Sequence, residues 1–423
     1  MTEFNLKCGF RDIGFTIPER NIAGFLDSKE NYGRGDSESI VECALQNPIN
    51  SGGIEDIVES GDTIALVIDD HTRNIPYDEI IPPVLKRLHS KGVSKDDISF
   101  FIATGTHRAS TAEEIDRMVG KDICTNYRFI SHDCDSNDHV YLGKTSRGSK
   151  VELNSQYFNT DKKILLGDIN LHYFAGYGGG RKSVVPGLSS RECIENNHKL
   201  MLDKYATSGK LAGNPLHEDL TEAVRMSGVD FILNVVKDRN GKLIEGFSGD
   251  LEDAFLKGTE LVKSLYMINT GEEVDALFIS AGGYPYDIDF HQSLKALENT
   301  IGCVKKNGTV YLSASCQDGV GYKNNKFQEF MNLYENKCQV EKAIKNRYVH
   351  GGHKAFYLYK ALEKVNLKMI SDMPFDELNK FKIHGAKRPT DVDLNAHSHL
   401  CSLYGNNYTS YVIPNANSIT ISR

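Results

Sequence analysis

A glycine-rich stretch carries several side chains that can do chemistry. Residues 172–187 read His-Tyr-Phe-Ala-Gly-Tyr-Gly-Gly-Gly-Arg-Lys-Ser-Val-Val-Pro-Gly, with five glycines between Gly176 and Gly187. Glycine adds no core volume; it allows positive φ or a close approach of the backbone to another group. Between these glycines stand a titratable imidazole, His172, and two cations, Arg181 and Lys182. The stretch therefore predicts a ligand-binding loop.

Part of this stretch, residues 176–183, is similar to a phosphate-binding P-loop. A P-loop needs glycine directly before its Lys-Ser pair, because that glycine sets the turn. Here the position is occupied by Arg181. The pattern therefore disfavours a nucleoside triphosphatase, and a glycine-rich surface turn with a solvated Lys-Ser pair is the plain alternative.

The elements around the loop alternate between short apolar strands and longer amphipathic helices. Such alternation predicts an α/β fold with mainly parallel sheets flanked by helices. The first group of expected strands comprises residues 63–68, 98–103, 127–131, 163–167 and 231–236. The pattern restarts near residue 268, with strands at 274–280, 309–315 and 367–371. We predict two domains, residues 1–267 and 268–404, with the closing strands of 405–423 returning to the first.

Two capping boxes are expected at helix starts in the first domain. Ser110 is followed three residues later by Glu113, and Ser189 by Glu192. A Ser or Thr with Glu or Gln three residues on satisfies two of the unpaired amides of a first helical turn.

Polar side chains follow the ends of four expected strands. They are Asp69-Asp-His-Thr-Arg73, Thr104-Gly-Thr-His-Arg108, Asp168 with His172, and His291-Gln292 with Lys295. Ligands of open α/β sheets bind outside the carboxyl ends of the strands. Because the fourth group lies beyond residue 268, we expect a polar cleft between the two domains. Each residue alone has a plainer interpretation: an ion pair for Arg73, a loop position for His107, a packed helix for His198.

Composition restricts the class of protein and its surroundings. The chain has 423 residues, 40% of them hydrophobic and 25% charged, with a formal net charge of −8. This negative balance argues against nucleic-acid binding, and no apolar run is long enough to span a membrane. The nine cysteines include no C-x-x-C pair, and the first residues lack the apolar core of a signal peptide. We therefore expect a cytoplasmic protein with reduced thiols.

These motifs, in this order, resemble the nickel-pincer-nucleotide-dependent lactate racemase family. The matching stretches are Asp69–Arg73, Gly105-Thr-His107, residues 172–187, His198, and His291-Gln292-x-x-Lys295. They span both expected domains.

The resemblance implies an isomerase that inverts carbon 2 of a 2-hydroxy acid by proton-coupled hydride transfer. It implies a nickel ion in pyridinium-3,5-bisthiocarboxylic acid mononucleotide, the nickel-pincer nucleotide, linked covalently to Lys182, with His198 as the protein ligand of the metal. His107 and His172 would be the acid–base pair, one for each hand of the substrate. The implied carboxylate clamp is Arg73, Gln292 and Lys295, and the implied cofactor cradle is Asp70, Thr72, Gly178, Gly179 and Gly180. Proteins that build the cofactor and insert nickel would be transient partners.

Two positions depart from the family pattern. Asn74 stands where proline is common, and His291 stands where an aromatic residue, tyrosine in the lactate enzymes, is expected. The substrate is therefore either lactate or a larger or dicarboxylic 2-hydroxy acid such as malate, or a sugar acid. Two alternatives are a nicotinamide-dependent dehydrogenase and a non-catalytic protein that binds a nucleotide cofactor. The first lacks G-x-G-x-x-G after the strand at 63–68, and the second does not need two histidine bases.

Overall fold

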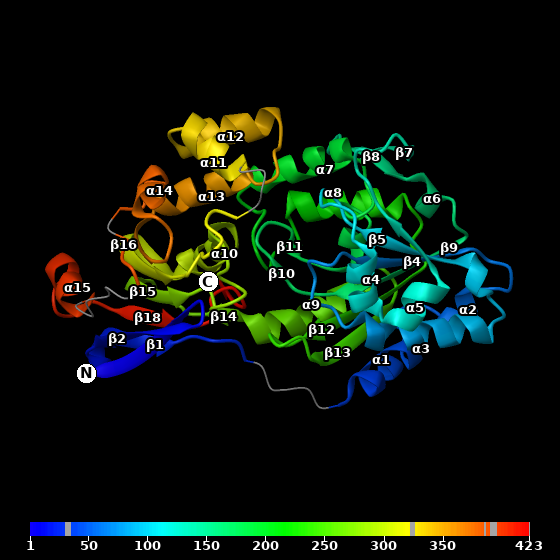
Figure 1. Cartoon of the computed structure of the whole chain (residues 1–423), viewed down its shortest axis with the longest axis horizontal. Coiled ribbons are helices and arrows are strands. Elements are labelled where there is room, and N and C mark those ends of the chain that lie inside the picture. Colours follow the sequence, from blue (N-terminus) through cyan, green and yellow to red (C-terminus); the bar gives the residue numbers. More distant parts are fainter. Residues whose placement is uncertain (30–34, 322–325, 385, 390–395, 423) are drawn as a thin grey trace. The chain divides into compact units, whose positions relative to one another are not determined.

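The computed structural model describes residues 1–29, 35–321, 326–384, 386–389 and 396–422. The chain forms two compact units. The N-terminal unit is Glu30–Ser264, and the C-terminal unit combines Met1–Lys29 with Leu265–Arg423. Each unit has a mainly parallel sheet flanked by helices, as the alternation of apolar segments predicts (Figure 1).

A six-stranded sheet with the order β13-β12-β9-β4-β5-β6 forms the centre of the N-terminal unit. Its strands are β4 (Ile64–Asp69), β5 (Ile98–Ala103), β6 (Arg128–Ser131), β9 (Lys162–Asp168), β12 (Phe231–Lys237) and β13 (Leu243–Gly249). Neighbouring strands are parallel except β12 and β13. The chain runs from β4 to β5 and β6, and then continues with β9 and β12 on the other side of β4. The strand order therefore reverses between β4 and β9, where ligands bind in open α/β sheets.

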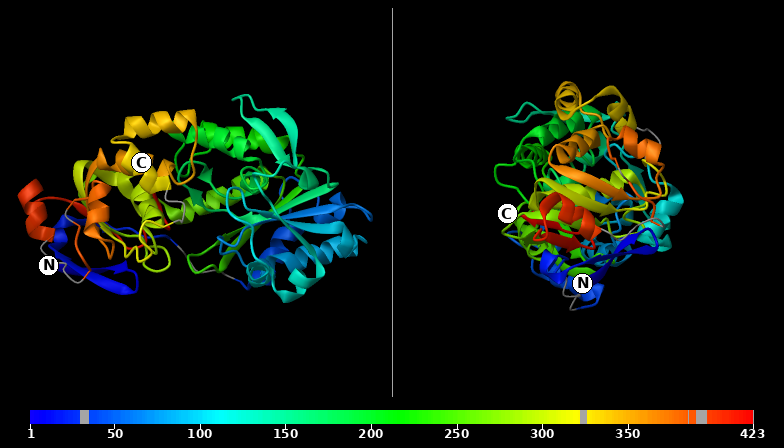
Figure 2. Two further views of the ribbon diagram at one scale, coloured as in Figure 1. Left: turned by 45° about the horizontal axis from the view of Figure 1, so that its top comes forward. Right: turned by 90° about the vertical axis from the view of Figure 1, so that its left-hand side faces the viewer.

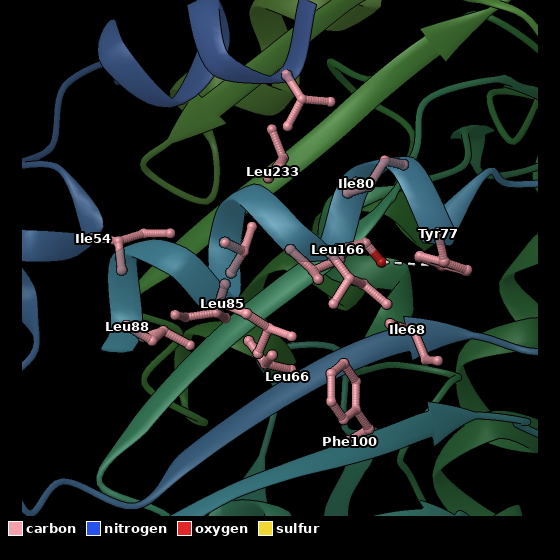
Figure 3. Close-up of a cluster of buried hydrophobic side chains, with 14 of the residues drawn as sticks. Ile54, Leu66, Ile68, Tyr77, Ile80, Leu85, Leu88, Phe100, Leu166 and Leu233 are labelled. Atoms are coloured by element: carbon pink, nitrogen blue, oxygen red, sulfur yellow. Dashed lines mark hydrogen bonds between the residues drawn. The ribbon is translucent and has the colours of Figure 1, made fainter. Parts of the chain in front are cut away.

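The helix α3 (Tyr77–Ser90) packs on this sheet. Acidic residues occupy its first turn and Arg87 and His89 its last, as the helix dipole favours. Figure 3 shows its apolar side chains directed at β4, β5, β9 and β12. The hydroxyl of Tyr77 donates to the carbonyl of Leu166 at 3.2 Å and accepts from the amide of Asp69 at 2.6 Å. This hydroxyl ties the end of β4 to β9 at the point of reversal.

The remaining helices of this unit include α1 (Ser37–Gln46), α4 (Ala112–Val119), α7 (Arg191–His198), α8 (Pro215–Arg225) and α9 (Asp253–Tyr266). Helix α1 packs beside α3 (Figure 1). The capping box of α4 is Thr111 with Glu114, not Ser110 with Glu113. Similarly, α7 is capped by Ser190, one residue after the expected Ser189. Each neighbouring hydroxyl is used elsewhere: Ser110 contacts His71, and Ser189 donates to the carbonyl of Pro186.

Two elements of the N-terminal unit were not expected from the sequence. The antiparallel strand β13 extends the sheet, and β7 (His139–Lys144) with β8 (Lys150–Asn154) forms a separate hairpin, teal in Figure 2. The hairpin is joined to the rest of the unit through buried Asp219, which accepts from Thr145 and Ser149 at 2.5 and 2.8 Å.

The C-terminal unit has a five-stranded parallel sheet with the order β17-β16-β15-β18-β3. Its strands are β3 (Ile22–Phe25), β15 (Val274–Ser280), β16 (Val304–Ser313), β17 (Val365–Ile370) and β18 (Ser410–Ile413). The expectation that residues 405–423 return to the first domain is wrong, because β18 pairs with β15 and β19 (Thr420–Ser422) pairs with β14 (Met267–Asn269). Residues 1–29 belong here too, since β3 pairs with β18.

The N-terminal hairpin, β1 (Thr2–Cys8) with β2 (Arg11–Ile17), covers part of this sheet (Figure 1, blue). Its Phe4 and Phe15 pack edge-on against Phe278 of β15, with ring centroids 5.3 and 5.2 Å apart. The helices of the unit are α10 (Phe290–Thr300), α11 (Lys326–Leu333), α12 (Lys337–Asn346), α13 (His353–Leu362), α14 (Phe375–Lys380) and α15 (Ala396–Tyr404). In the described part of the chain, no helix is both long and apolar enough to cross a membrane.

Candidate active site

Two carboxylates end the strands at the point where the sheet order reverses. Asp69 ends β4 and Asp168 ends β9. The ammonium of Lys237 lies 3.0 Å from Asp168. Loss of hydration, followed by repulsion from Asp168, raises the pKa of Asp69 to about 7. At neutral pH this carboxyl is therefore close to its midpoint of ionisation.

The next residue, Asp70, holds His107. Oδ2 of Asp70 lies 2.5 Å from Nδ1 of His107, and Oδ1 accepts from the amide and hydroxyl of Thr72 at 3.0 and 2.5 Å. Burial alone would raise the pKa of Asp70, but the hydrogen bonds from His107 and Thr72 lower it. Because the carboxylate is ionised, Nδ1 of His107 is the donor. The side chains of Asp70 and Thr72, expected in the cofactor cradle, are thus engaged with each other and with His107.

His172 lies in a small hairpin, β10 (Leu171–His172) with β11 (Gly176–Tyr177). Its Nδ1 accepts from the amides of Phe174 and Ala175 at 3.5 and 3.2 Å. Loss of hydration, followed by the charges of Lys182 and Arg73, lowers the pKa of His172 well below its usual value. The neutral ring therefore carries its proton on Nε2, the reverse of His107.

Arg181 is buried and holds the glycine loop together. It donates to the carbonyls of Ala175 and Tyr177, both at 3.0 Å, and of Gly179 at 3.2 Å. Its Nε donates to Nδ1 of His217 at 3.1 Å, and its guanidinium lies 4.3 Å from the ring centroid of Phe255. Burial lowers the pKa of Arg181 to about 9, and burial together with Arg181 lowers that of His217 to about 3. Arg181 thus binds the protein's own backbone.

The glycines of the loop are required by packing within the protein. Gly179 has φ +86°, and a Cβ there would lie 2.4 Å from the carbonyl oxygen of Asp168. A Cβ at Gly178 would lie 2.5 Å from the side chain of Asn170, and one at Gly180 would press on the ring of Phe255. Contact of these three glycines with a cofactor stays a prediction, but the close packing alone accounts for them.

Lys182 lies in a 3-10 turn, η3 (Gly180–Ser183), that follows these glycines. Loss of hydration, then the charges of Arg73 and Arg181, lower its pKa well below the usual value of a lysine. The site therefore disfavours the ammonium form of Lys182 relative to the free, nucleophilic amine. Next to it, the hydroxyl of Ser183 is buried without a hydrogen-bond partner among the described residues.

His198 is the last residue of α7 and is buried. Its ring packs edge-on against Phe174, with centroids 5.3 Å apart, and Phe174 in turn packs against His172 at 4.5 Å. The N-terminal unit thus brings His198 to the same loop as His172 and Lys182.

The remaining expected site residues lie on α10 of the C-terminal unit. Asp289 caps this helix, and the ammonium of Lys295 donates to the side-chain oxygen of Gln292 at 2.6 Å. His291 packs with His350 and His353, with ring centroids 6.4 and 6.2 Å away. Burial, then the charge of Lys354, lower the pKa of His291 to about 2. The clamp of Arg73 with Gln292 and Lys295 stays a prediction, since its members belong to different units.

A buried ion pair beside this helix was missed from the sequence. Lys354 of α13 lies 3.1 and 3.2 Å from the two carboxylate oxygens of Glu298, and the side chains are 1% and 7% exposed. Nearby on the same helix, Nδ1 of His353 lies 3.1 Å from the hydroxyl of Tyr348 and accepts from the amide of Gly351 at 3.2 Å. The sequence carries no local signal for this pair, because Glu298 and Lys354 lie 56 residues apart on two different helices.

Comparison with known proteins identifies the family. The lactate racemase N-terminal domain family matches residues 8–209, and the lactate racemase C-terminal domain family matches residues 270–421. The chain belongs to the lactate racemase family. It is 34% identical over 326 residues to the lactate racemase of Thermoanaerobacterium thermosaccharolyticum, covering 76% of each chain. It is 34% identical over 327 residues to that of Lactiplantibacillus plantarum, again covering 76% of each. The chain is thus an isomerase of the racemase class.

Solved structures agree with this assignment. The lactate racemase apoprotein of T. thermosaccharolyticum superposes with a TM-score of 0.90 and 29% identity, over the whole of both chains. A Thermotoga maritima protein shares the fold, with a TM-score of 0.68 and 18% identity over 92% of this chain and 100% of its own. The predicted family and fold class are therefore confirmed.

Proposed function

We propose that the protein inverts carbon 2 of a 2-hydroxy acid by removing and returning the hydrogen on that carbon as hydride. The observation that carries the proposal is the arrangement of the N-terminal unit. Two imidazoles with opposite neutral tautomers, His107 and His172, share this unit with Lys182, a lysine whose charged form is disfavoured by burial and by neighbouring cations. A site that only bound a nucleotide would need neither the two imidazoles of opposite tautomer nor a lysine with a lowered pKa.

The residues fit the nickel-pincer nucleotide. A lowered pKa favours the free amine of Lys182, the form that a covalent thioamide link requires, and the unsatisfied hydroxyl of Ser183 offers a buried polar contact next to it. The buried imidazole of His198 is a nitrogen ligand that suits a borderline-soft metal such as nickel. When bound, this group would supply the hydride acceptor.

The protein's own residues then handle charge and the hydroxyl proton. His107 takes the proton of the substrate hydroxyl as the hydrogen leaves carbon 2, so that no alkoxide builds up. His172 has the corresponding acid–base role for the opposite enantiomer of the substrate. Arg73, with Gln292 and Lys295, holds the carboxylate by charge-assisted hydrogen bonds, which keep the ketone in place until the hydride returns.

The substrate is lactate or a 2-hydroxy acid with a longer or more polar side chain, such as malate or a sugar acid. His291 supports the second choice, because a neutral imidazole donates and accepts hydrogen bonds that a small methyl group cannot use. Substitution of His291 by tyrosine should then shift preference toward small monocarboxylates, measured as relative kcat/KM over a panel of 2-hydroxy acids. An unchanged ranking would remove this support.

Racemisation in heavy water tests the proposal. Hydride that passes to a bound group and back does not exchange with solvent, so early product should carry essentially no deuterium at carbon 2. Protein made in cells that supply the cofactor should also carry a mass adduct on Lys182 and about one nickel per chain. Substantial deuterium at carbon 2 in early product would contradict hydride transfer, and full activity without adduct and nickel would contradict the cofactor.

A further inference from the structure

We propose that Asp70 is a positioning residue that fixes the tautomer of His107, so that the two histidines are a matched acceptor and donor rather than two equal bases. The inference rests on the proposed function for its catalytic meaning, but its structural part concerns the protein alone. It gives Asp70 a role beside the expected one in the cofactor cradle, which stays a prediction.

The first half of the argument is the direction of the hydrogen bond to His107. Both oxygens of Asp70 are used, Oδ2 by Nδ1 of His107 and Oδ1 by the amide and hydroxyl of Thr72. Asp70 is 2% exposed, so water does not compete with these donors. An ionised carboxylate only accepts, and Nδ1 of His107 must carry a proton. In the neutral ring the lone pair is therefore on Nε2, which makes that atom the basic position.

The second half is the opposite arrangement at His172. Two backbone amides, from Phe174 and Ala175, point at its Nδ1. An amide N–H only donates, so this Nδ1 holds the lone pair and Nε2 holds the proton. For Nε2 of His172 to act as a base in the neutral ring, Nδ1 would have to take a proton and oppose two N–H groups. The hairpin of β10 and β11 thus presents an N–H donor where Asp70 makes His107 present an acceptor.

The two histidines therefore start the reaction in different roles. His107 starts as the group that accepts the hydroxyl proton, and His172 starts as the group that donates a hydrogen bond to the substrate oxygen. In a racemase the equilibrium constant fixes the ratio of the kcat/KM values for the two enantiomers of the substrate. The asymmetry must therefore appear in kcat and KM taken separately and in their dependence on pH.

Substitution of Asp70 by asparagine is the sharpest perturbation. The two donors from Thr72 keep the amide oxygen of the new side chain at the position of Oδ1. Its NH2 group then faces Nδ1 of His107, which must accept, and the proton of His107 moves to Nε2. The shape of the site is kept while the tautomer is reversed. The matched control is Glu114→Gln, an acid-to-amide change 3.7 Å from Nε2 of His71.

The readout is the ¹⁵N spectrum of histidine-labelled full-length protein, at a pH where the rings are neutral, with His107 and His172 assigned by single substitution. We expect protonated Nδ1 on His107 and protonated Nε2 on His172 in the unaltered protein, and protonated Nε2 on both in D70N. E114Q should leave both patterns unchanged. In cofactor-loaded protein, D70N should lower kcat by about 100-fold or more, in line with the loss of a general base.

Three results would overturn the proposal: protonated Nε2 on His107 in the unaltered protein, an unchanged His107 tautomer in D70N, or a reversed tautomer with undiminished kcat. The first needs no variant, so it holds even if D70N fails to fold. Because these spectra are recorded without cofactor or substrate, they stand apart from the heavy-water test. Deuterium at carbon 2 would contradict the proposed hydride transfer and leave the tautomers as measured.

Discussion

Replacing Arg181 by lysine tests whether the glycine loop is held by a buried guanidinium. The guanidinium donates four hydrogen bonds, three to carbonyls of its own loop and one to His217, and it stacks on Phe255. An ammonium donates from a single atom, so it cannot reach acceptors spread around a planar fork. We expect the substitution to leave at least one and generally two of these acceptors unsatisfied in the interior.

The size of the effect follows from those acceptors. Each buried carbonyl or imidazole nitrogen without a donor costs about 1–3 kcal/mol. Loss of the stacked contact adds less, because an ammonium retains part of the attraction to Phe255. The free energy of unfolding of the N-terminal unit should fall by about 3 kcal/mol. Attachment of the cofactor to neighbouring Lys182 should fall with it, because the same loop places that amine.

Urea unfolding followed by far-ultraviolet circular dichroism measures this change on unloaded protein, since the chain has no tryptophan to serve as a fluorescent reporter. Arg191→Lys is the matched control. Arg191 lies ten residues further along and pairs with Asp135, but the two side chains are 36% and 59% exposed. Exposed pairs contribute about 0–1 kcal/mol. If R181K and R191K lower the unfolding free energy by the same amount, the loop does not depend on the guanidinium.

Three further predictions concern other buried charges. Asp69 binds its proton more tightly in the native state than in the unfolded chain, so the free energy of unfolding falls as pH rises from about 4 to 7, by at most about 4 kcal/mol. Asp69→Asn should reduce this fall, as measured by unfolding midpoints across the same pH range. Lys182 is the reverse case, because its native pKa is depressed. Lys182→Met should stabilise unloaded protein at pH 7, with the advantage shrinking toward pH 10.5. An advantage independent of pH would contradict the depressed pKa. Lys354→Met should lower the free energy of unfolding, measured by thermal unfolding, by about 3–5 kcal/mol, because it leaves the buried carboxylate of Glu298 without its partner. The double variant with Glu298→Leu should recover most of this loss.

The positions of the N-terminal strands were predictable because buried parallel strands are continuous apolar runs. The expected segments 63–68, 98–103 and 163–167 correspond closely to β4, β5 and β9. Pairing partners were less predictable, because a local pattern does not state which strand lies next to which. Residues 405–423 look like strands and are strands, but only tertiary packing places β18 beside β15. The same holds for residues 22–25, which pair with β18 across almost the whole length of the chain.

The candidate site shows the same contrast: its residues could be predicted from the sequence, but their partners could not. The sequence marks both Asp70 and His107 as candidate site residues, but it does not show that they are hydrogen-bonded to each other. The role of Asp70 in the cofactor cradle stays a prediction. Consecutive strands are usually neighbours in a sheet, and β4 and β5 pair with Asp69 opposite Ala103. That register places the residues just after each strand next to one another, and it was the available signal. The role of Arg181 carried no such signal, because its partners are backbone carbonyls, which every sequence supplies.

The charges around the glycine loop bear on the proposed covalent attachment of a cofactor to Lys182. Burial first, and then the charges of Arg73 and Arg181, disfavour an ammonium on Lys182. Arg181 is itself buried and bonded only to neutral acceptors in the contacts described above, so its charge is not neutralised there. Asp69 and Asp168 offset this only partly, since Asp69 is itself held near its midpoint. The proposed thioamide would be neutral at every pH, so the link would remove a charge that the site disfavours. Attachment as proposed would therefore lower the electrostatic cost that burial and the neighbouring cations impose on Lys182.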